Sequence, residues 1–513
     1  MRIFFLFALL ALSPGSVISQ PLVYPNIQEW TAANGNFKFS ENAAIVCSQE
    51  DFKRLQHDIL QFQEDLESVS GMKLELSPGE PQRGDIQFVL DTDIGKIGIE
   101  GYQLDIEKSV VVRANSTQGI FYGMQTLLQL FKQDSKVRRG KAVDYPLIGV
   151  RGFMLDVARD FFEVDYIESI IRKLAWMKMN FIHIHFTDRE AFRLKSDLFP
   201  GLAHPTEHYT KEDIRRLQDY AAKYHVMLIP EIEMPAHASS YTDYNPFLAF
   251  DCPSMRVGHK VTENFEASDQ ADWMFTLDIT RREVRTWLKA VLDEWIPLFD
   301  APHFHIGGDE WQYDANKYAC PELMEATRRA GYEYPGDLFV EFVNEMNNWV
   351  KSHGKITHIW NWWRFSPDKG KADEVRMNRT SIQPDKDIIV HVWNYARQQE
   401  ILDDGYKVII TSEEGPEALY STPYNGDGKP GDYGVFQNQR IYEEWIPKTG
   451  PSILGYKVCL WTDTNDGRPD EWYEPYYNLP IAVLAEKTWG SRTETSIKEF
   501  EEKVNKIGVG LKE

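Results

Sequence analysis

The sequence predicts an α/β protein in which a small α+β domain, residues 20–145, precedes a (β/α)8 TIM barrel over residues 146–513. Before Pro146, strand-like and helix-like segments mix without a regular order. After it, eight short apolar segments alternate with helical patterns, which is typical of a barrel of parallel strands. A doubly wound open sheet is the alternative, but no glycine-rich phosphate loop follows the first segment.

The N-terminal 19 residues are typical of a secretory signal peptide. Arg2 gives a positively charged start, Ile3–Leu12 form an apolar core, and Val17–Ser19 form an acceptable cleavage site. The apolar run is too short to span a bilayer. We therefore expect export to an extracellular, periplasmic or lysosome-like compartment, rather than the alternative of a buried N-terminal strand.

The formal net charge of −22 argues against nucleic acid and anionic membrane surfaces as partners. In an oxidising compartment the four cysteines allow two disulfides, with Cys252 and Cys320 as the more favourable pair because both lie in loop-like sequence. Cys459 lies in an apolar strand pattern and is predicted to be a buried free thiol. Asn115 and Asn378 match the glycosylation acceptor pattern.

The elements predicted for the first domain follow from the spacing of apolar residues. Helical spacing covers Asp51–Ser70 and Gln118–Phe131, and Asp85–Leu90 has the pattern of a strand. Gly101–Arg113 is typical of two strands joined as a hairpin. The basic stretch Lys132–Lys141 is predicted to be a linker. We find no cluster of catalytic residue types in this domain.

The eight predicted barrel strands are Gly152–Asp156, Phe181–Phe186, Val226–Pro230, Phe304–Gly307, Ile356–Trp360, Ile388–Trp393, Val408–Thr411 and Lys457–Trp461. Thr210 is expected to cap a helix that runs through Tyr224, and Thr280 with Glu283 to form a capping box ahead of Val284–Leu298. Two more helices are predicted at Tyr476–Trp489 and Ser496–Lys506.

Polar and aromatic residues gather where these strands end, which in a barrel is the active-site rim. The set is Asp156, Arg159, His183, His185, Asp188, Glu231, Glu233, His237, Asp309, Glu310, Trp360, Trp393, Tyr420, Trp461 and Asp463. We expect Glu231 and Glu233 to follow the third strand and Tyr420 to lie in the loop after the seventh. Charged groups beside tryptophan faces suit a ring-shaped ligand rich in hydroxyl groups.

Four motifs at these strand ends resemble those of family 20 glycoside hydrolases, the β-N-acetylhexosaminidases. They are Arg151–Arg159 (RGFMLDVAR), His183–Asp188 (HIHFTD), Pro230–His237 (PEIEMPAH) and His305–Glu310 (HIGGDE). Their order and spacing match across the barrel, and the preceding segment resembles the small α+β domain of that family. The resemblance implies an exo-acting, retaining enzyme that removes terminal β-linked GlcNAc or GalNAc, and the predicted signal peptide implies that this enzyme is secreted.

The resemblance also implies a division of labour between two adjacent acids, because the substrate's own 2-acetamido oxygen is the nucleophile in this family. Asp309 would hold the acetamido N–H, and Glu310 would protonate the leaving oxygen and then activate water. The remaining roles implied are Tyr420 on the acetamido oxygen, Asp188 and His237 behind Glu310, Arg159 on the sugar hydroxyls, and Trp360, Trp393 and Trp461 as pocket walls. Asp463 stands where the family usually has Glu in the substrate site.

Other positions also depart from the pattern of the family. They are Arg189 after Asp188, Trp362 near the fifth strand's end, Thr422 after Tyr420, and Trp311 after the acidic pair. These departures leave the chemistry unchanged but affect the expected recognition of the 4- and 6-hydroxyls and the shape of the leaving-group site. A variant that releases a GlcNAc-containing disaccharide, like a lacto-N-biosidase, therefore remains an alternative.

Two other classes of protein are weighed against this interpretation. A His-x-His pair such as His183 and His185 can bind zinc. The fifth and sixth strands, however, end in Trp360 and Trp393 rather than in further metal ligands, so a structural role for the two histidines is favoured. A binding protein that has lost catalysis is disfavoured by the presence of both Asp309 and Glu310. We expect a glycan substrate, no cofactor, and no nucleic-acid or membrane partner; monomer and homodimer both stay open.

Overall fold

The computed structural model describes residues 20–95, 97–250, 276–311, 321–364, 378–393, 397–412, 419–421, 436–463, 467–490 and 495–511. The predicted signal peptide, the Cys252–Cys320 pair and Thr422 lie outside these ranges. The chain divides into two compact units, Met1–Tyr145 and Pro146–Glu513. Each unit is described separately below.

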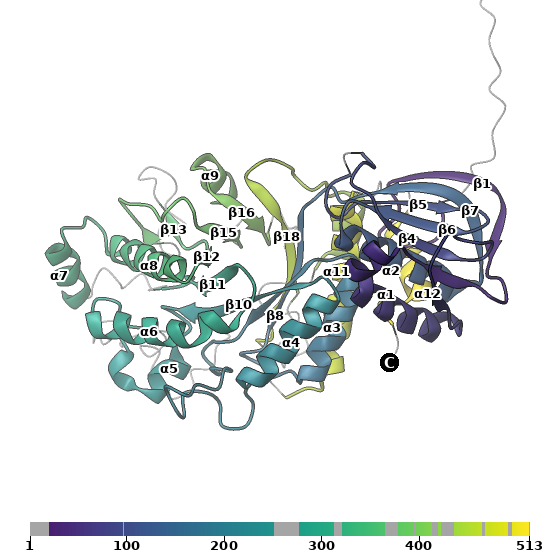
Figure 1. The fold of residues 1–513 in the computed structure, drawn as a ribbon. Helices are drawn as coiled ribbons and strands as arrows, with labels where there is room; N and C mark the ends of the chain where they lie inside the picture. Colours follow the sequence, from purple (N-terminus) through teal and green to yellow (C-terminus); the bar gives the residue numbers. More distant parts are fainter. Residues whose placement is uncertain are drawn as a thin grey trace, which may run out of the picture. The chain divides into compact units, whose positions relative to one another are not determined.

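The first unit is a seven-stranded sheet with two helices (Figure 1). The strand order is β1-β7-β5-β6-β4-β2-β3, with bounds β1 Glu29–Lys38, β2 Ala44–Val46, β3 Glu75–Ser77, β4 Ile86–Leu90, β5 Tyr102–Ile106, β6 Val110–Ala114 and β7 Lys136–Asp144. Helices α1 (Gln49–Ser70) and α2 (Thr117–Gln133) pack against each other, and α2 contacts the four central strands β4 to β7. The hairpin prediction is confirmed, because β5 and β6 pair antiparallel.

The predicted linker at Lys132–Lys141 is wrong. Its first residues end α2, and most of the rest belongs to β7, which pairs antiparallel with both β1 and β5. The basic side chains misled the prediction because they alternate with buried positions such as Val137 and Ala142. A strand with one solvated face shows this two-residue alternation even when its polar residues are strongly charged.

The second unit is a closed barrel of eight parallel strands, which confirms the predicted fold (Figure 1). The strands are β8 Val150–Asp156, β9 Phe181–His185, β10 Met227–Met234, β11 His303–Gly307, β12 Ile356–Trp360, β15 Ile389–Val392, β16 Lys407–Ile410 and β18 Ile453–Leu460. The barrel closes because β18 pairs with both β16 and β8. Short strands β13 (Trp363–Arg364) and β14 (Asn378–Arg379) pair with each other, and β17 (Tyr420–Ser421) pairs with β18.

Helices accompany the strands of the barrel unit. They are α3 Val164–Trp176, α4 Lys211–Lys223, α5 Ser239–Tyr244, α6 Arg282–Trp295, α7 Pro321–Ala330, α8 Pro335–Ser352, α9 Gln398–Asp403, α10 Asn438–Glu443, α11 Glu474–Trp489 and α12 Ile497–Ile507. Short 3-10 helices cover Pro246–Leu248, Ile296–Leu298 and Asp470–Tyr473.

The two predicted helix starts have different outcomes. Thr210 caps α4 as expected, since its hydroxyl accepts from the Asp213 N–H and the Asp213 carboxylate accepts from the Thr210 N–H. The capping box at Thr280 is wrong, because that hydroxyl donates to Asp278 and α6 begins at Arg282 without a side-chain cap. An acidic side chain two residues upstream therefore competes with the helix for the hydroxyl.

The barrel interior is layered, because alternate residues of each strand point inward. The lowest layer is apolar and contains Phe181, Ile229, Ile389 and Ile409. Two residues further along these strands come the fully buried polar residues His183, Glu231, His391 and Thr411. An aromatic layer with Trp360, Trp393 and Trp461 packs around Met154 and Cys459. Cys459 is a buried free thiol, as predicted.

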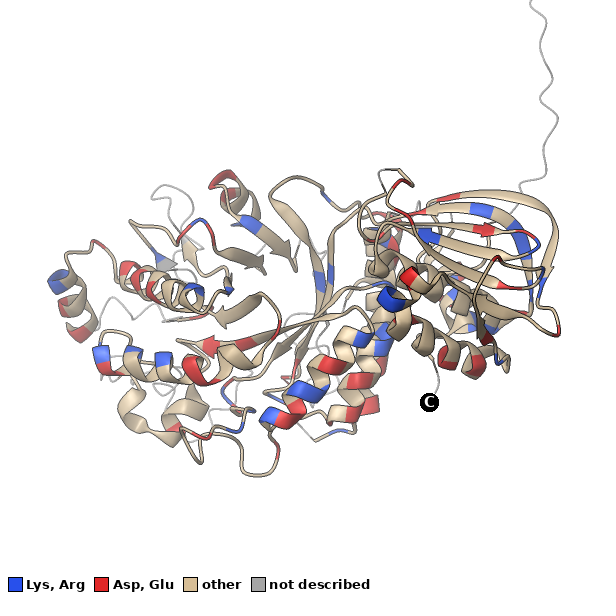
Figure 2. Ribbon diagram, viewed as in Figure 1, with Lys and Arg blue, Asp and Glu red and all other residues tan. Residues whose placement is uncertain are grey.

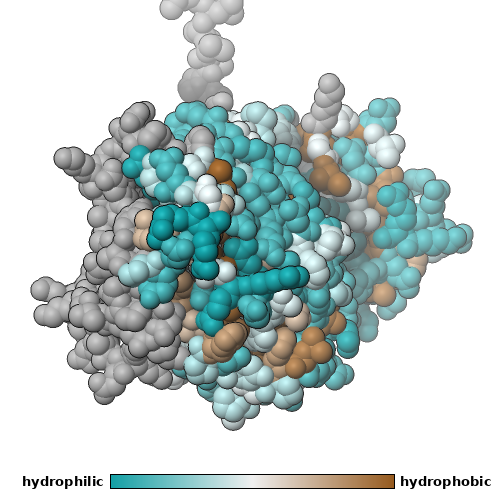
Figure 3. All heavy atoms as spheres, turned by 90° about the vertical axis from the view of Figure 1, so that its left-hand side faces the viewer, coloured by the Kyte–Doolittle hydropathy of each residue, from teal (hydrophilic) through white to brown (hydrophobic). Residues whose placement is uncertain are grey.

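Basic and acidic residues both occur along the helices (Figure 2). The face of the barrel unit seen in Figure 3 is largely hydrophilic, with hydrophobic side chains in small scattered groups. Within the described ranges, no helix has both the length and the apolar composition needed to cross a bilayer.

Candidate active site

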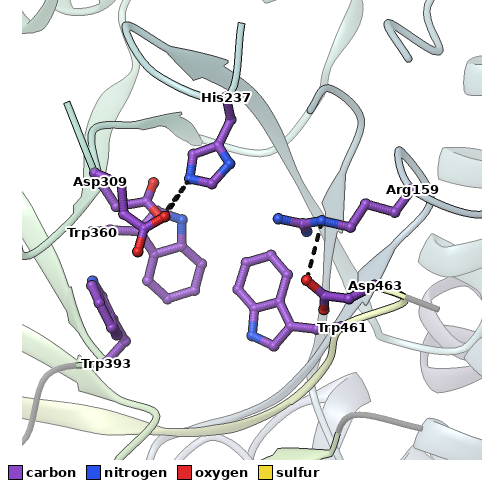
Figure 4. Close-up of a pocket in the computed structure, with 8 residues that line it drawn as sticks. Arg159, His237, Asp309, Trp360, Trp393, Trp461 and Asp463 are labelled. Carbon is purple, nitrogen blue, oxygen red and sulfur yellow. Dashed lines mark ion pairs between the residues drawn. The ribbon is translucent and has the colours of Figure 1, made fainter. Parts of the chain in front are cut away.

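One pocket gathers the predicted site residues (Figure 4). Its lining consists of Arg159, His237, Asp309, Glu310, Trp360, Trp393, Trp461 and Asp463. All eight belong to the predicted set, and they come from the ends of β8, β10, β11, β12, β15 and β18. Of the other two residues to which the resemblance gave a catalytic or binding role, Asp188 lies buried behind the pocket, and Tyr420 lies on β17 rather than in a loop, which corrects that prediction.

The acidic pair follows a tight turn at the end of β11. Gly307 and Gly308 have φ values of +69° and +97°, a region that residues with a Cβ rarely adopt. A Cβ on Gly307 would lie 1.8 Å from Glu233 Oε2, and the Gly308 N–H donates to Glu233 Oε1 at 2.9 Å. Glu233 therefore fills the space beneath the turn that presents Asp309 and Glu310.

Glu233 is fully buried, and this sets its ionic state. Burial, and then the negative charges of Asp309 and Glu231, raise its pKa well above the usual range. The neutral, protonated form of Glu233 is therefore favoured. Contrary to prediction, it and Glu231 do not follow the third strand but lie inside β10, which extends to Met234.

His237 links the acidic pair to a buried carboxylate. Its Nε2 lies 3.3 Å from Glu310 Oε2 and 3.5 Å from Asp309 Oδ2, while its Nδ1 lies 3.1 Å from Asp188 Oδ1. Burial alone would lower its pKa, but the carboxylates of Asp188 and Asp309 outweigh it and raise the pKa well above the usual range. The protonated imidazolium form of His237 is therefore favoured. Both His237 and Glu310 adopt left-handed conformations, with φ of +51° and +50°.

Arg159 holds the opposite side of the pocket. Its guanidinium pairs with Asp156 at 2.7 Å and Asp188 at 2.8 Å, and lies 3.5 Å from Asp463. Burial would lower its pKa, but these carboxylates raise it. Burial, followed by the charges of neighbouring carboxylates, raises the pKa of Asp463 to about 6 despite the opposing effect of Arg159. Asp463 Oδ2 accepts no hydrogen bond from the described residues.

Three tryptophans form the walls. Trp360 and Trp461 lie with ring centroids 5.8 Å apart, and Trp360 Nε1 donates to Glu231 Oε1 at 2.6 Å. Trp393 stacks on Trp362, with centroids 5.6 Å apart and planes 9° apart. Trp362 therefore buttresses a wall rather than lining the pocket. The three predicted walls thus meet around one pocket.

Trp311 directly follows the acidic pair in the sequence, which suggested a place at the leaving-group site, but the structure places its side chain elsewhere. Its side chain is fully buried and stacks on Phe339 of α8 with centroids 5.9 Å apart. Its carbonyl accepts from Trp362 Nε1 at 3.2 Å. Trp311 therefore belongs to the packing behind the site and does not border the pocket.

The sequence interpretation missed a group of polar residues inside the barrel. His358 on β12, His391 on β15 and Lys457 on β18 are almost completely buried. His358 stands two positions before Trp360, and His391 two before Trp393, so the strands that seemed to offer only tryptophan also carry inward-facing histidines. The two-residue period of each strand could have revealed them.

Two groups of described residues have the composition of a metal site: His183, Glu231 and His305, and His185, Glu231 and Glu233. In the first, the Lys457 ammonium lies 2.6 Å from His183 Nδ1, and this positive charge opposes a metal cation. In the second, both ring nitrogens of His185 contact carboxylates, which outweigh the effect of burial and raise the pKa of His185 to about 10. A metal ion would have to displace this strongly held proton. Neither group is a ready-made metal site.

Comparisons with known proteins agree on one family. The model of the catalytic domain of glycosyl hydrolase family 20 matches residues 149–492, and the model of domain 2 of that family matches residues 20–145. A β-hexosaminidase of Porphyromonas gingivalis is 29% identical over 93% of this chain and 62% of its own length. A lacto-N-biosidase of Bifidobacterium bifidum is 22% identical over 96% of this chain and 42% of its own length. The chain thus spans less than two thirds of these two relatives.

Solved structures share the fold. A β-N-acetylhexosaminidase from Bacteroides fragilis has a TM-score of 0.72 at 22% identity and covers 94% of each chain. An exo-β-N-acetylglucosaminidase from Vibrio harveyi in complex with N-acetylglucosamine has a TM-score of 0.76 at 20% identity, over 96% of this chain and 77% of its own. The match of the catalytic-domain model to most of the barrel confirms the predicted resemblance: the chain belongs to glycosyl hydrolase family 20.

Proposed function

We propose that the protein is an exo-acting, retaining β-N-acetylhexosaminidase that removes terminal β-linked GlcNAc or GalNAc. Family membership and the similarity to several β-hexosaminidases support a hexosaminidase. The observation that carries the mechanism is the placement of two consecutive acids, Asp309 and Glu310, beside one imidazolium, His237.

Adjacent acids are poorly placed to attack one sugar from opposite faces, because neighbouring Cα atoms are only about 3.8 Å apart. A retaining enzyme with this arrangement needs another nucleophile, and the acetamido oxygen of the substrate supplies it. In this proposal Asp309 accepts the acetamido N–H and stabilises the positive oxazolinium that forms. Glu310 donates its proton to the glycosidic oxygen, and the resulting carboxylate then takes a proton from water. His237, held by Asp188, orients Glu310.

The remaining pocket residues would bind the sugar. The faces of Trp360, Trp393 and Trp461 suit the acetamido methyl group and the C–H groups of the ring. Arg159 and Asp463 would read the ring hydroxyls, and Tyr420 would donate to the acetamido oxygen. The pocket is bounded by walls on several sides, which favours a terminal sugar over a segment inside a chain.

The central test replaces Glu310 by Gln, which keeps the size of the side chain and removes its proton-transfer role. We expect turnover of an aryl N-acetyl-β-glucosaminide to fall by about 10²–10⁴-fold, as for loss of a general acid–base group. Glu212→Gln, on the exposed first turn of α4, is the matched control and should keep wild-type rates. Near-normal rates for Glu310→Gln would refute the proposed assignment.

Two product analyses test the finer parts of the proposal. Proton NMR of the first-formed product should show the β-anomer if the reaction retains configuration. Digestion of chitooligosaccharides should release single sugars from one end if the enzyme acts as an exoglycosidase. A product with the α-anomer, or internal fragments from early time points, would contradict these assignments.

A second candidate is an enzyme that releases a GlcNAc-containing disaccharide. It is favoured by the lacto-N-biosidase that aligns over 96% of this chain and by the short side chain of Asp463 at the rim. Comparing aryl lacto-N-bioside with aryl GlcNAc as substrates separates the two. Faster release of the disaccharide would replace the first proposal with the second.

We also propose that the enzyme is exported, since residues 1–19 have the composition of a signal peptide. N-terminal sequencing of the protein recovered from its producing cells should begin at Gln20. A chain that begins at Met1 would contradict this.

A further inference from the structure

Lys457 is a charged side chain at the centre of the barrel interior. It is fully buried on the inward face of β18. Its Nζ lies 2.6 Å from His183 Nδ1 and 2.7 Å from His391 Nδ1, and 4.0 Å from the ring centroid of Trp360. Burying an ammonium group is costly unless it is well hydrogen-bonded. The two histidines provide these hydrogen bonds, which raises the question of what the buried charge does.

The ammonium of Lys457 fixes where its neighbours carry their protons. It can only donate, so His183 and His391 must accept at Nδ1 and carry their single protons at Nε2. His391 Nε2 then donates to His358 Nδ1 at 2.8 Å, and His358 Nε2 donates to His303 Nδ1 at 2.9 Å. Burial, and next the charge of Lys457, lower the pKa values of His183 and His391, which keeps both rings neutral. One cation thus selects one tautomer for each ring.

The selected tautomer of His183 matters for Glu231. His183 Nε2 lies 3.0 Å from Glu231 Oε2, close enough for a strong electrostatic interaction. With the proton at Nε2, the positive end of the N–H faces the carboxylate. With the proton at Nδ1, a lone pair would face the same carboxylate and repel it. Lys457 excludes that second arrangement.

Glu231 in turn supports two sides of the pocket. It accepts the indole N–H of Trp360 at 2.6 Å, and it accepts from His185 Nδ1 at 2.7 Å. His185 Nε2 lies 3.0 Å from Asp188 Oδ2. Through Asp188 and His237, this line of contacts reaches Glu310. The orientation of a pocket wall and of the acidic pair therefore depends on the ionic state of Glu231.

We propose that Lys457 is a positioning residue for the active site: by fixing the tautomer of His183 it places a ring N–H beside Glu231, the carboxylate that holds Trp360 and the contacts leading to Glu310. The kinetic consequences rest on the proposed function. Lys457 itself touches no substrate, since Trp360 lies between it and the pocket.

The role of Lys457 is confined to the pH range in which it is charged. Burial lowers its pKa to about 8, although Cys459, Glu231 and Asp309 oppose this. A neutral amine carries a lone pair and can accept as well as donate, so the tautomer of His183 is no longer fixed. The titratable groups that face Lys457 are His183 on β9, Glu231 on β10, His305 on β11, His358 on β12, His391 on β15, Cys459 on β18 and Asp309.

The test compares Lys457→Met with Lys487→Met. Lys487 is a second buried lysine of the barrel unit, on α11, whose Nζ donates to the Tyr442 carbonyl at 3.0 Å and which does not line the pocket. At pH 6.5, Lys457→Met should lower kcat/KM for an aryl N-acetyl-β-hexosaminide about tenfold or more, mainly through KM, because a wall of the sugar site is released. Lys487→Met should leave kcat/KM within about twofold of wild type.

Two readouts separate positioning from general support of the fold. The ratio of wild-type to Lys457→Met kcat/KM should shrink as the pH rises from 6 to 9, because the wild-type protein loses the ammonium. The double variant Lys457→Met/His183→Ala should be no worse than the more damaging single variant, because both changes break one line of contacts. A ratio that is constant with pH, or fully additive effects, would overturn the proposal.

Failure of the proposed function can be told apart from failure of this inference. If wild-type protein turns over no aryl N-acetylhexosaminide, the proposed function fails, and ¹⁵N NMR of histidine-labelled protein still decides on Lys457. At pH 6.5 the His183 signals should be those of a neutral ring protonated at Nε2 in the wild type. A ring protonated at Nδ1, or at both nitrogens, would overturn the role of Lys457.

Discussion

Replacing Gly307 by Ala should damage both stability and activity, because three separate costs meet at this residue. The left-handed backbone conformation, φ +69°, costs a residue with a Cβ about 1–2 kcal/mol. The new Cβ would lie 1.8 Å from Glu233 Oε2 and 2.0 Å from its Cδ, and such overpacking of a buried site costs about 1–3 kcal/mol. Moving Glu233 also breaks its bond from the Gly308 N–H, for about 1 kcal/mol more. The total is about 3–6 kcal/mol.

Gly331→Ala is the matched control, since Gly331 has φ +78° and no atom lies within 4 Å of the position that its Cβ would take. It should lose only the backbone contribution, about 1–2 kcal/mol. Urea unfolding followed by tryptophan fluorescence measures both variants. Adding Glu233→Ala to Gly307→Ala should recover part of the loss, because it empties the space that the Cβ needs. Equal unfolding free energies for Gly307→Ala and Gly331→Ala would refute the close packing of Glu233 beneath the turn.

Two further predictions concern the pocket walls and rim. Trp362→Leu removes the ring on which Trp393 stacks, so KM for an aryl N-acetylhexosaminide should rise severalfold with little change in kcat; an unchanged KM would show that Trp393 holds its orientation alone. Burial raises the pKa of Asp463 from its ordinary value of 3.8 to about 6 in the folded protein. Between pH 3.8 and pH 6 the native state therefore binds more protons than the unfolded state, and the free energy of unfolding falls as the pH rises through this range. Asp463→Asn should remove this loss of stability. Urea unfolding at pH 4 and pH 7 should show that the variant gains stability relative to wild type at the higher pH. A difference in unfolding free energy between variant and wild type that does not change with pH would contradict the raised pKa.

The barrel could be predicted from the sequence because each strand is an apolar run that its neighbours bury on both faces. The bounds of β10 could not, since Glu231 and Glu233 look like the polar start of a loop although both are fully buried. Their burial depends on partners that come from other strands, such as His185 and Gly308. No local pattern contains that information.

The pocket was predicted better than its supporting residues. The eight lining residues stand at strand ends, where position along the strand is enough to indicate exposure to a ligand. Lys457 lies in an apolar run and was counted only as part of a strand, because a lysine there is compatible with the fold only if histidines from β9 and β15 accept its hydrogen bonds. The environment of Trp311 likewise depends on Phe339 of α8, which is adjacent in space and not in sequence.

The left-handed conformations of His237 and Glu310 have a consequence for the evolution of this chain. Both residues have a Cβ but adopt a backbone conformation that glycine would adopt more easily, which costs about 1 kcal/mol or more for each. A thermostabilising screen would therefore favour glycine at position 310, and selection for catalysis would remove it. At position 237 glycine would not be favoured, because it would also remove a partner of the buried Asp188 carboxylate, which costs about 3–5 kcal/mol.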